Sequence, residues 1–146
     1  MKKSFVFCLM SFVLVSAVSA AEAKKLNPYD EVGALEGSLE KAKKPFRERA
    51  AEMKKLLAEP RIATNRMANV RAQKAIANYC LMRNWLQNWY YDYDLIKEIY
   101  PEMMPKILAD KSYNDIDKLW FVENYVKYFA VTEKYDDGVA MVLDQL

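Results

Sequence analysis

The segment "TNRMANVRAQKAIANYCLMRNWLQNWYY", residues 64–91, decides the fold class that the sequence predicts. Apolar side chains recur along it at intervals of three and four residues, which is the period of an α-helix with one buried face. They form two neighbouring rows, so the buried face is wide, and we predict one helix over this segment at the centre of a helical bundle. The rows are Ala77, Leu81, Trp85 and Trp89, and Ala72, Ile76, Tyr79, Leu86 and Tyr90.

The residues before this segment predict a helix that ends at Pro60. Asn27 can cap its start, and Pro28 suits the first helical position. Apolar residues keep the helical spacing from Val32 onward, straight through Pro45. Because a proline inside a helix removes one backbone hydrogen bond, we expect the first helix to be kinked at Pro45, or divided there into two abutting helices.

The sequence after residue 91 predicts several shorter helices. Asp94 can cap a short helix that runs through Ile99, and Pro101 and Pro105 then exclude an uninterrupted helix. A further helix is expected where Ser112 begins a pattern similar to a capping box.

The last part of the chain mixes helix and strand signals. Residues Tyr125–Val131 continue a helical phase, yet they are rich in residues that favour strands, so both alternatives stay open. Asp136 or Asp137 begins a final helix. The sequence as a whole predicts a mainly α fold, a small bundle of four to five helices with a possible short strand near 125–131.

The first twenty residues have the pattern of a secretory signal peptide. Lys2 and Lys3 precede an apolar stretch, and small residues lead to a cleavage site after Ala20. The stretch is shorter than the roughly 20 residues that a membrane span needs. We therefore expect a periplasmic or secreted protein with one helical domain over residues 21–146, which contacts the membrane only through the signal peptide before cleavage.

Two absences exclude several kinds of chemistry. The chain has no histidine, which excludes histidine relays, histidine-bound zinc and c-type haem attachment. Without the leader it keeps only Cys80, which predicts a buried thiol or a disulfide with another molecule, burial being favoured by its apolar neighbours. Asp92 and Asp94 stand two apart and suit helix capping better than a cation site. We expect no enzyme, no cofactor and no metal.

Charge indicates no nucleic-acid partner. The predicted leader holds two of the 22 basic residues and none of the 20 acidic ones, so the remaining chain is formally neutral. Five basic residues and no acid lie between residues 61 and 91, interleaved with aromatic residues. Such a pattern can line a nucleic-acid groove, but here the charges are spread around the predicted helix.

Aromatic residues supply the candidate contact site. Their densest cluster, residues 85–93, is either a stacking platform for a partner or part of the core. We predict that proteins of the envelope or other exported proteins bind this cluster and the C-terminal apolar segment, and self-association stays open. The candidate partner-binding residues are Trp85, Trp89, Tyr91, Tyr93, Tyr128 and Phe129.

The order of these segments resembles the TraF-type conjugal-transfer pilus-assembly family. The resemblance rests on Asn69, Val70 and Gln73, on the segment Tyr91–Tyr93 and on the residues from Tyr125 onward. It implies an exported protein with a helical region followed by a thioredoxin-like domain.

Two departures limit what the resemblance implies. Glu133 and Asp136 stand where redox-active relatives carry the C-x-x-C cysteines, so no thiol chemistry is carried over. Fifteen residues follow Val131, too few for the further strands that a thioredoxin-like sheet needs. We therefore expect a shortened, degenerate relative that keeps the helical part.

The functional expectation is a non-catalytic exported protein for envelope interaction or assembly, such as in a conjugation or secretion apparatus. The alternative is a helical periplasmic chaperone or ligand-binding module with a groove lined by Met and Trp. An enzyme that uses Asp92 and Asp94 comes third.

Overall fold

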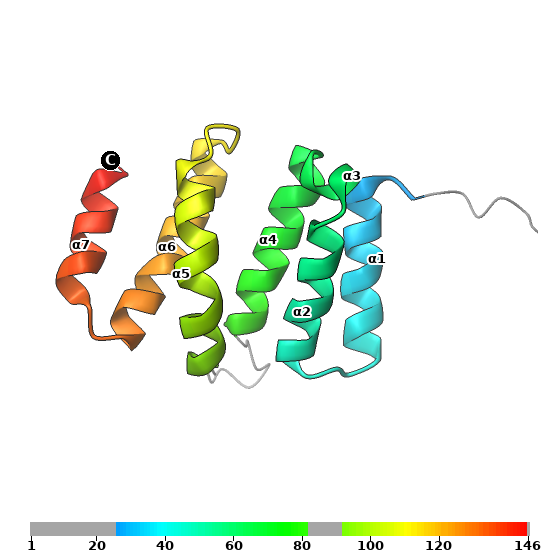
Figure 1. The fold of residues 1–146 in the computed structure, drawn as a ribbon, viewed down its shortest axis with the longest axis horizontal. Helices are drawn as coiled ribbons and strands as arrows, with labels where there is room; N and C mark the ends of the chain where they lie inside the picture. The colour runs from blue at the N-terminus through cyan, green and yellow to red at the C-terminus, as the bar shows by residue number, and fades with distance from the viewer. Residues whose placement is uncertain (1–25, 82–91, 146) are drawn as a thin grey trace, which may run out of the picture.

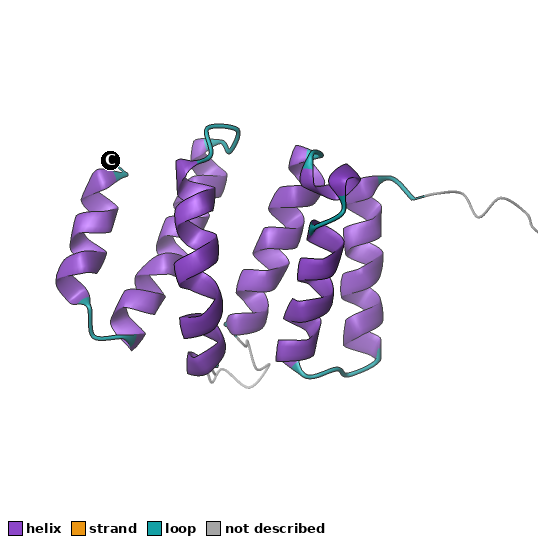
Figure 2. Ribbon diagram, viewed as in Figure 1, coloured by secondary structure: helices purple, strands orange, loops and turns teal. Residues whose placement is uncertain are grey.

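The computed structural model describes residues 26–81 and 92–145, and within these ranges it contains seven α-helices and no strand (Figures 1 and 2). The predicted mainly α class is confirmed, while the number of helices exceeds the expected four to five. The helices are α1 (Pro28–Lys41), α2 (Phe46–Leu57), α3 (Pro60–Ala63), α4 (Arg66–Cys80), α5 (Tyr93–Ala109), α6 (Asp115–Val131) and α7 (Tyr135–Asp144).

Pro45 separates two helices, so the predicted division into two helices is confirmed and the alternative, a kink in one long helix, is wrong. Helix α1 ends at Lys41, and Lys43 adopts the left-handed conformation, with φ of 51°. The amide of Lys43 donates to the carbonyl of Glu40 and that of Lys44 to Leu39, at 2.9 and 3.3 Å, which is a Schellman ending. Pro45 then precedes α2, where its missing N–H costs no helical bond, and α1 and α2 form a hairpin (Figure 1).

Helix α4 is central as predicted, but it is shorter than the predicted segment. The side chain of Asn65 caps it by accepting from the amide of Ala68 at 3.0 Å. Leu81 leaves the helical conformation, with φ of −111° and ψ of 62°, so a continuous helix through residue 91 is wrong. Residues 82–91 lie outside the described ranges. Helix α4 packs against α1, α2, α3, α5 and α6.

Helix α5 runs through both prolines, so the predicted break in this region is wrong. Pro101 and Pro105 are four residues apart and both are exposed, so the carbonyls that they leave unpaired are on the solvent side. Each proline costs about 3 kcal/mol, but eight buried side chains on the opposite face contribute roughly 1.5–3 kcal/mol each. These are Leu95, Ile96, Ile99, Tyr100, Met103, Met104, Ile107 and Leu108.

The caps of α5 and α6 also differ from the predicted ones. Asp92, not Asp94, caps α5, because its Oδ1 accepts from the amide of Leu95 at 2.9 Å. Asn114 caps α6 by accepting from the amide of Asp117 at 2.7 Å, so the capping pattern assigned to Ser112 is wrong by two residues.

Helix α6 settles the ambiguous segment, since residues 125–131 are helical and the short strand is wrong. The helix ends with a second Schellman motif: the amide of Glu133 (φ 58°) donates to Ala130 at 3.3 Å, and that of Lys134 to Phe129 at 2.9 Å. Helix α7 begins at Tyr135, one residue before Asp136.

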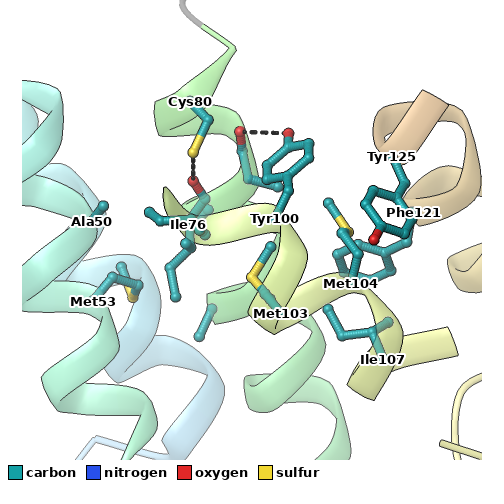
Figure 3. Packing of buried hydrophobic residues seen from close by; sticks show 14 of the residues in the cluster. Ala50, Met53, Ile76, Cys80, Tyr100, Met103, Met104, Ile107, Phe121 and Tyr125 are labelled. Carbon is teal, nitrogen blue, oxygen red and sulfur yellow. Dashed lines mark hydrogen bonds between the residues drawn. The ribbon is translucent and has the colours of Figure 1, made fainter. Parts of the chain in front are cut away.

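The buried core joins the α1–α4 half of the molecule to α5 and α6. Figure 3 shows the hydroxyl of Tyr100 donating to the carbonyl of Ala77, at 3.3 Å, across the α4–α5 contact. Cys80 is fully buried and its thiol donates to the carbonyl of Ile76 at 3.4 Å, which confirms the expected burial. Burial raises the pKa of this thiol to about 12. Helix α7 contributes only Gly138 to the buried set of the described residues.

Candidate functional site

Helix α7 lies at one end of the array and packs against α6 (Figure 1). Gly138 makes this contact close: a Cβ added there would lie 2.9 Å from the Cβ and 3.2 Å from the Cγ of Phe129. Real Cβ atoms do not approach other atoms to less than 3.0 Å, so any larger residue would push the helices apart. The sequence "DDG" therefore brings the first turn of α7 directly against the end of α6.

An apolar groove of about 310 Å³, here called the α6–α7 groove, lies between these two helices. Helix α6 contributes Val126, Phe129 and Ala130 to its lining. Helix α7 contributes Tyr135, Gly138, Val139, Val142 and Leu143. No charged side chain is among these lining residues, so the groove can cover an apolar partner without leaving a buried charge unpaired.

The walls of the groove are open to solvent. Tyr135, Val139 and Leu143 are 63%, 60% and 65% exposed, although each is largely apolar. Helical spacing places them on one side of α7, beside Gly138. Apolar surface that gathers in this way, as opposed to single exposed residues, is typical of an interaction site.

The exposed apolar surface continues along α6 beyond the groove. Ile116 and Leu119 are 80% and 68% exposed, and their spacing places them on the same side of α6 as Val126. The opposite side of α6 is buried: Phe121, for example, is wholly inaccessible. We call Ile116, Leu119 and Val126 the α6 stripe. Helix α6 thus has two apolar sides, and the described residues cover one of them.

The charged residues around this surface are mainly acidic. Helix α7 has three aspartates and no basic residue, namely Asp136, Asp137 and Asp144, all exposed. On α6, Asp115 and Glu123 are exposed, and Glu123 lies between Leu119 and Val126 on the stripe side. The nearby basic residues are fewer, and two of them are engaged: Lys127 donates to Asn124 at 2.9 Å and Lys118 to the carbonyl of Leu108 at 3.1 Å.

Of the six predicted partner-binding residues, those that the structure describes do not all lie together in one site. Trp85, Trp89 and Tyr91 lie outside the described ranges. Phe129 is buried beneath α7 at the floor of the groove, and the ring of half-buried Tyr128 lies 5.3 Å from that of Phe129. The two form an aromatic cluster with Tyr125, whose ring lies 5.6 Å from that of Tyr128.

Tyr93 lies apart from that cluster, at the start of α5. It is 53% exposed and lines a second hollow, of about 460 Å³, together with Lys97, Lys127 and the end of α6. This hollow and the α6–α7 groove share Ala130, but Tyr93 lines only the hollow and Phe129 only the groove.

The candidate contact residues from the sequence did not include Ile116, Leu119 or Val126, which the structure leaves exposed on one side of α6. The available signal was spacing: on α6 the buried positions Phe121, Tyr125 and Phe129 follow one register, which leaves Ile116 and Leu119 on another side.

Asp92 and Asp94 do not form a carboxylate pair. The Asp92 side chain caps α5, and Asp94 is exposed in the first turn, where negative charge is favourable to the helix dipole. In residues 26–81 and 92–145 no three cysteine, aspartate or glutamate side chains gather as metal ligands would.

Asn69, which carries part of the resemblance, has a clear local role. Its amide group donates to the carbonyl of Ala63 at 3.0 Å and accepts from the hydroxyl of Tyr113 at 2.6 Å. It therefore links α3 and α4 to the loop before α6. Among the described helices, none is both long and apolar enough for a membrane span.

Comparisons with protein-family models, with curated proteins and with solved structures gave no match to this chain.

Proposed function

We propose that this chain is a non-catalytic exported protein that acts by contact in envelope assembly, such as that of a conjugation or secretion apparatus. The observation that supports this proposal best is the open apolar surface formed by the α6–α7 groove and the α6 stripe. A partner that covered this surface would remove from water the largest exposed apolar side chains of α6 and α7.

The free energy available is of the order that a specific contact needs. Full burial of a side chain of this size contributes roughly 1.5–3 kcal/mol. Tyr135, Val139 and Leu143 are between 60% and 65% exposed, so covering them would contribute roughly 3–6 kcal/mol. A micromolar complex requires about 8 kcal/mol after the cost of association is met, so Ile116 and Leu119 on the stripe and polar contacts at its rim must supply the remainder.

The leader pattern and the family resemblance support the exported and assembly parts of the proposal. Residues 1–20 have the charge and apolar pattern of a signal peptide, and the resemblance to the TraF-type family points toward conjugation. Fractionation of the native host would test export. A periplasmic or secreted chain that lacks residues 1–20 is expected, and a full-length chain retained in the cytoplasm would contradict it.

The contact itself is tested by cross-linking in intact cells followed by purification of the tagged chain. Leu143→Asp places a charge in the groove, whereas Ala140→Asp places the same charge on an exposed position of α7 outside the groove lining. We expect an envelope protein to be retained by the wild type and by Ala140→Asp but lost from Leu143→Asp. Equal retention by all three proteins would refute the proposed contact.

The chaperone or ligand-binding alternative is favoured only by the uncharged lining of the groove. Neither methionine nor tryptophan is among the described residues that line the α6–α7 groove, whereas the alternative expects a groove lined by both. An aggregation assay separates the two functions. Suppression of aggregation of an unfolded client at stoichiometric excess, abolished by Leu143→Asp, would support the chaperone.

A further inference from the structure

We infer that the α6–α7 groove and the α6 stripe receive one amphipathic helix of a partner protein, with a basic residue on each flank of its apolar face. This inference rests on the proposed function, because it names the kind of partner that the contact surface fits. The groove supplies the apolar contact, and the acidic residues beside it favour a partner helix that carries positive charge.

The dimensions of the surface fit a contact of two to three helical turns. At 1.5 Å per residue, the α6 stripe from Ile116 to Val126 spans about 15 Å, and the α7 wall from Tyr135 to Leu143 about 12 Å. A partner helix with apolar residues at positions i, i+3 or i+4, and i+7 would present one such row to this surface. The described part of this chain has no strand, so it offers no sheet edge for an extended peptide.

The charge around the surface argues for a basic partner. On α7, helical spacing places Asp136 at the flank of the groove, whereas Asp137 and Asp144 lie on the far side of the helix, and the exposed Lys134 precedes it. On α6, Glu123 lies within the stripe. Like charges brought together across an interface cost binding energy, and opposite charges accelerate association. Lysine or arginine residues beside the apolar row of the partner would complement these carboxylates.

The same charges disfavour the two other occupants of an apolar groove. A second copy that inserted the apolar side of its own α7 would bring another Asp136 toward the carboxylates of this surface and no basic residue of that helix. An anionic lipid surface attracts basic segments, so it would repel this acidic one. Both occupants are outcomes that the experiment can detect.

The test uses the leaderless chain and two synthetic 14-residue peptides, measured by fluorescence anisotropy at low salt. Both peptides carry leucine at positions i, i+4, i+7 and i+11, one with lysine on the flanks and one with glutamate. We expect micromolar binding of the basic peptide, at least tenfold tighter than that of the acidic one. The preference should shrink as salt is added, because screening weakens charge interactions.

Matched variants locate the binding. Leu143→Asp and Leu119→Asp should each weaken binding of the basic peptide at least tenfold. Circular dichroism would show that both variants remain folded. Met67→Asp, at a 63% exposed position on α4, is the control and should leave binding unchanged. Asp136→Asn combined with Glu123→Gln should reduce the preference for the basic peptide, whereas Glu48→Gln on α2 should not.

Several results would overturn the inference. Equal binding of both peptides would refute the charge selection, and equal binding of a scrambled basic peptide would refute the helical form. A dimer in sedimentation analysis that Leu143→Asp dissociates would assign the groove to a second copy. Binding to anionic vesicles that Leu143→Asp abolishes would assign it to lipid.

The inference and the proposed function can fail separately. If the basic peptide binds as expected but no envelope protein depends on Leu143, the assembly function fails and the groove specificity stands. If an envelope protein is lost from Leu143→Asp while the peptides bind equally, the function stands and the inference fails.

Discussion

The glycines of α1 and α7 give a matched pair of substitutions that tests how α7 packs. Replacing glycine by alanine inside a helix stabilises it by about 1 kcal/mol when nothing else changes. A Cβ added at Gly37 would have no atom within 4 Å, so Gly37→Ala should raise the free energy of unfolding by about that amount. At Gly138 the added Cβ would lie 2.9 Å from the Cβ of Phe129, which belongs to the neighbouring helix.

The expected magnitude for Gly138→Ala follows from two opposing terms. Overpacking of a tight contact costs roughly 1–3 kcal/mol, and the helix propensity of alanine offsets about 1 kcal/mol. We therefore expect the free energy of unfolding to fall by roughly 0–2 kcal/mol. The difference between the two variants, roughly 1–3 kcal/mol, isolates the packing of Gly138 against Phe129.

Urea denaturation followed by circular dichroism measures both values on the leaderless chain. If Gly138→Ala stabilises as much as Gly37→Ala does, α7 does not rest on Phe129 and the geometry of the α6–α7 groove is wrong. Gly37→Ala is the matched control, because its added methyl group has no atom within 4 Å.

Three further substitutions test other parts of the fold. Burial raises the pKa of the Cys80 thiol from 9.0 to about 12, so the thiol of the unfolded chain ionises at a lower pH than that of the folded chain. The free energy of unfolding should therefore fall as the pH rises above about 9. Cys80→Ala should reduce this pH dependence, which denaturation curves at pH 7 and 10 would measure. Lys43, with φ of 51°, should prefer glycine, and Lys43→Gly should stabilise by about 1 kcal/mol, whereas a loss would contradict the Schellman ending of α1. Pro101→Ala should restore a helical hydrogen bond and raise the free energy of unfolding by as much as about 3 kcal/mol, which a higher melting temperature would report. An unchanged melting temperature would show that α5 is already broken there.

Local signals predicted the elements that depend on a few neighbouring residues. The cap at Asn27 is present, because its Oδ1 accepts from the amide of Asp30 at 2.9 Å, and Pro28 occupies the first helical position. The apolar rows of residues 66–81 are buried as expected, with Ala72, Ile76 and Ala77 almost inaccessible. These features are readable from sequence because their partners lie within one turn of the same helix.

The prolines show where local signals stop being sufficient. Pro45 lies between two helices, whereas Pro101 and Pro105 lie inside one, although each proline removes the same backbone donor. The difference lies in the opposite face of the helix. Around Pro101 that face is continuously buried, and its contacts with α4 and α6 outweigh the local cost.

By itself, the order of residues determined that the described chain is helical, and the missing histidine removed imidazole chemistry, because both follow from local periodicity and composition. Only the tertiary structure decided which apolar side chains remain in contact with water. Phe121 and Leu119 belong to the same helix and are both apolar, yet one is inaccessible and the other is 68% exposed. Burial depends on which distant helix lies opposite each side: the spacing within α6 separates its two apolar sides, but it does not tell which of them another helix covers.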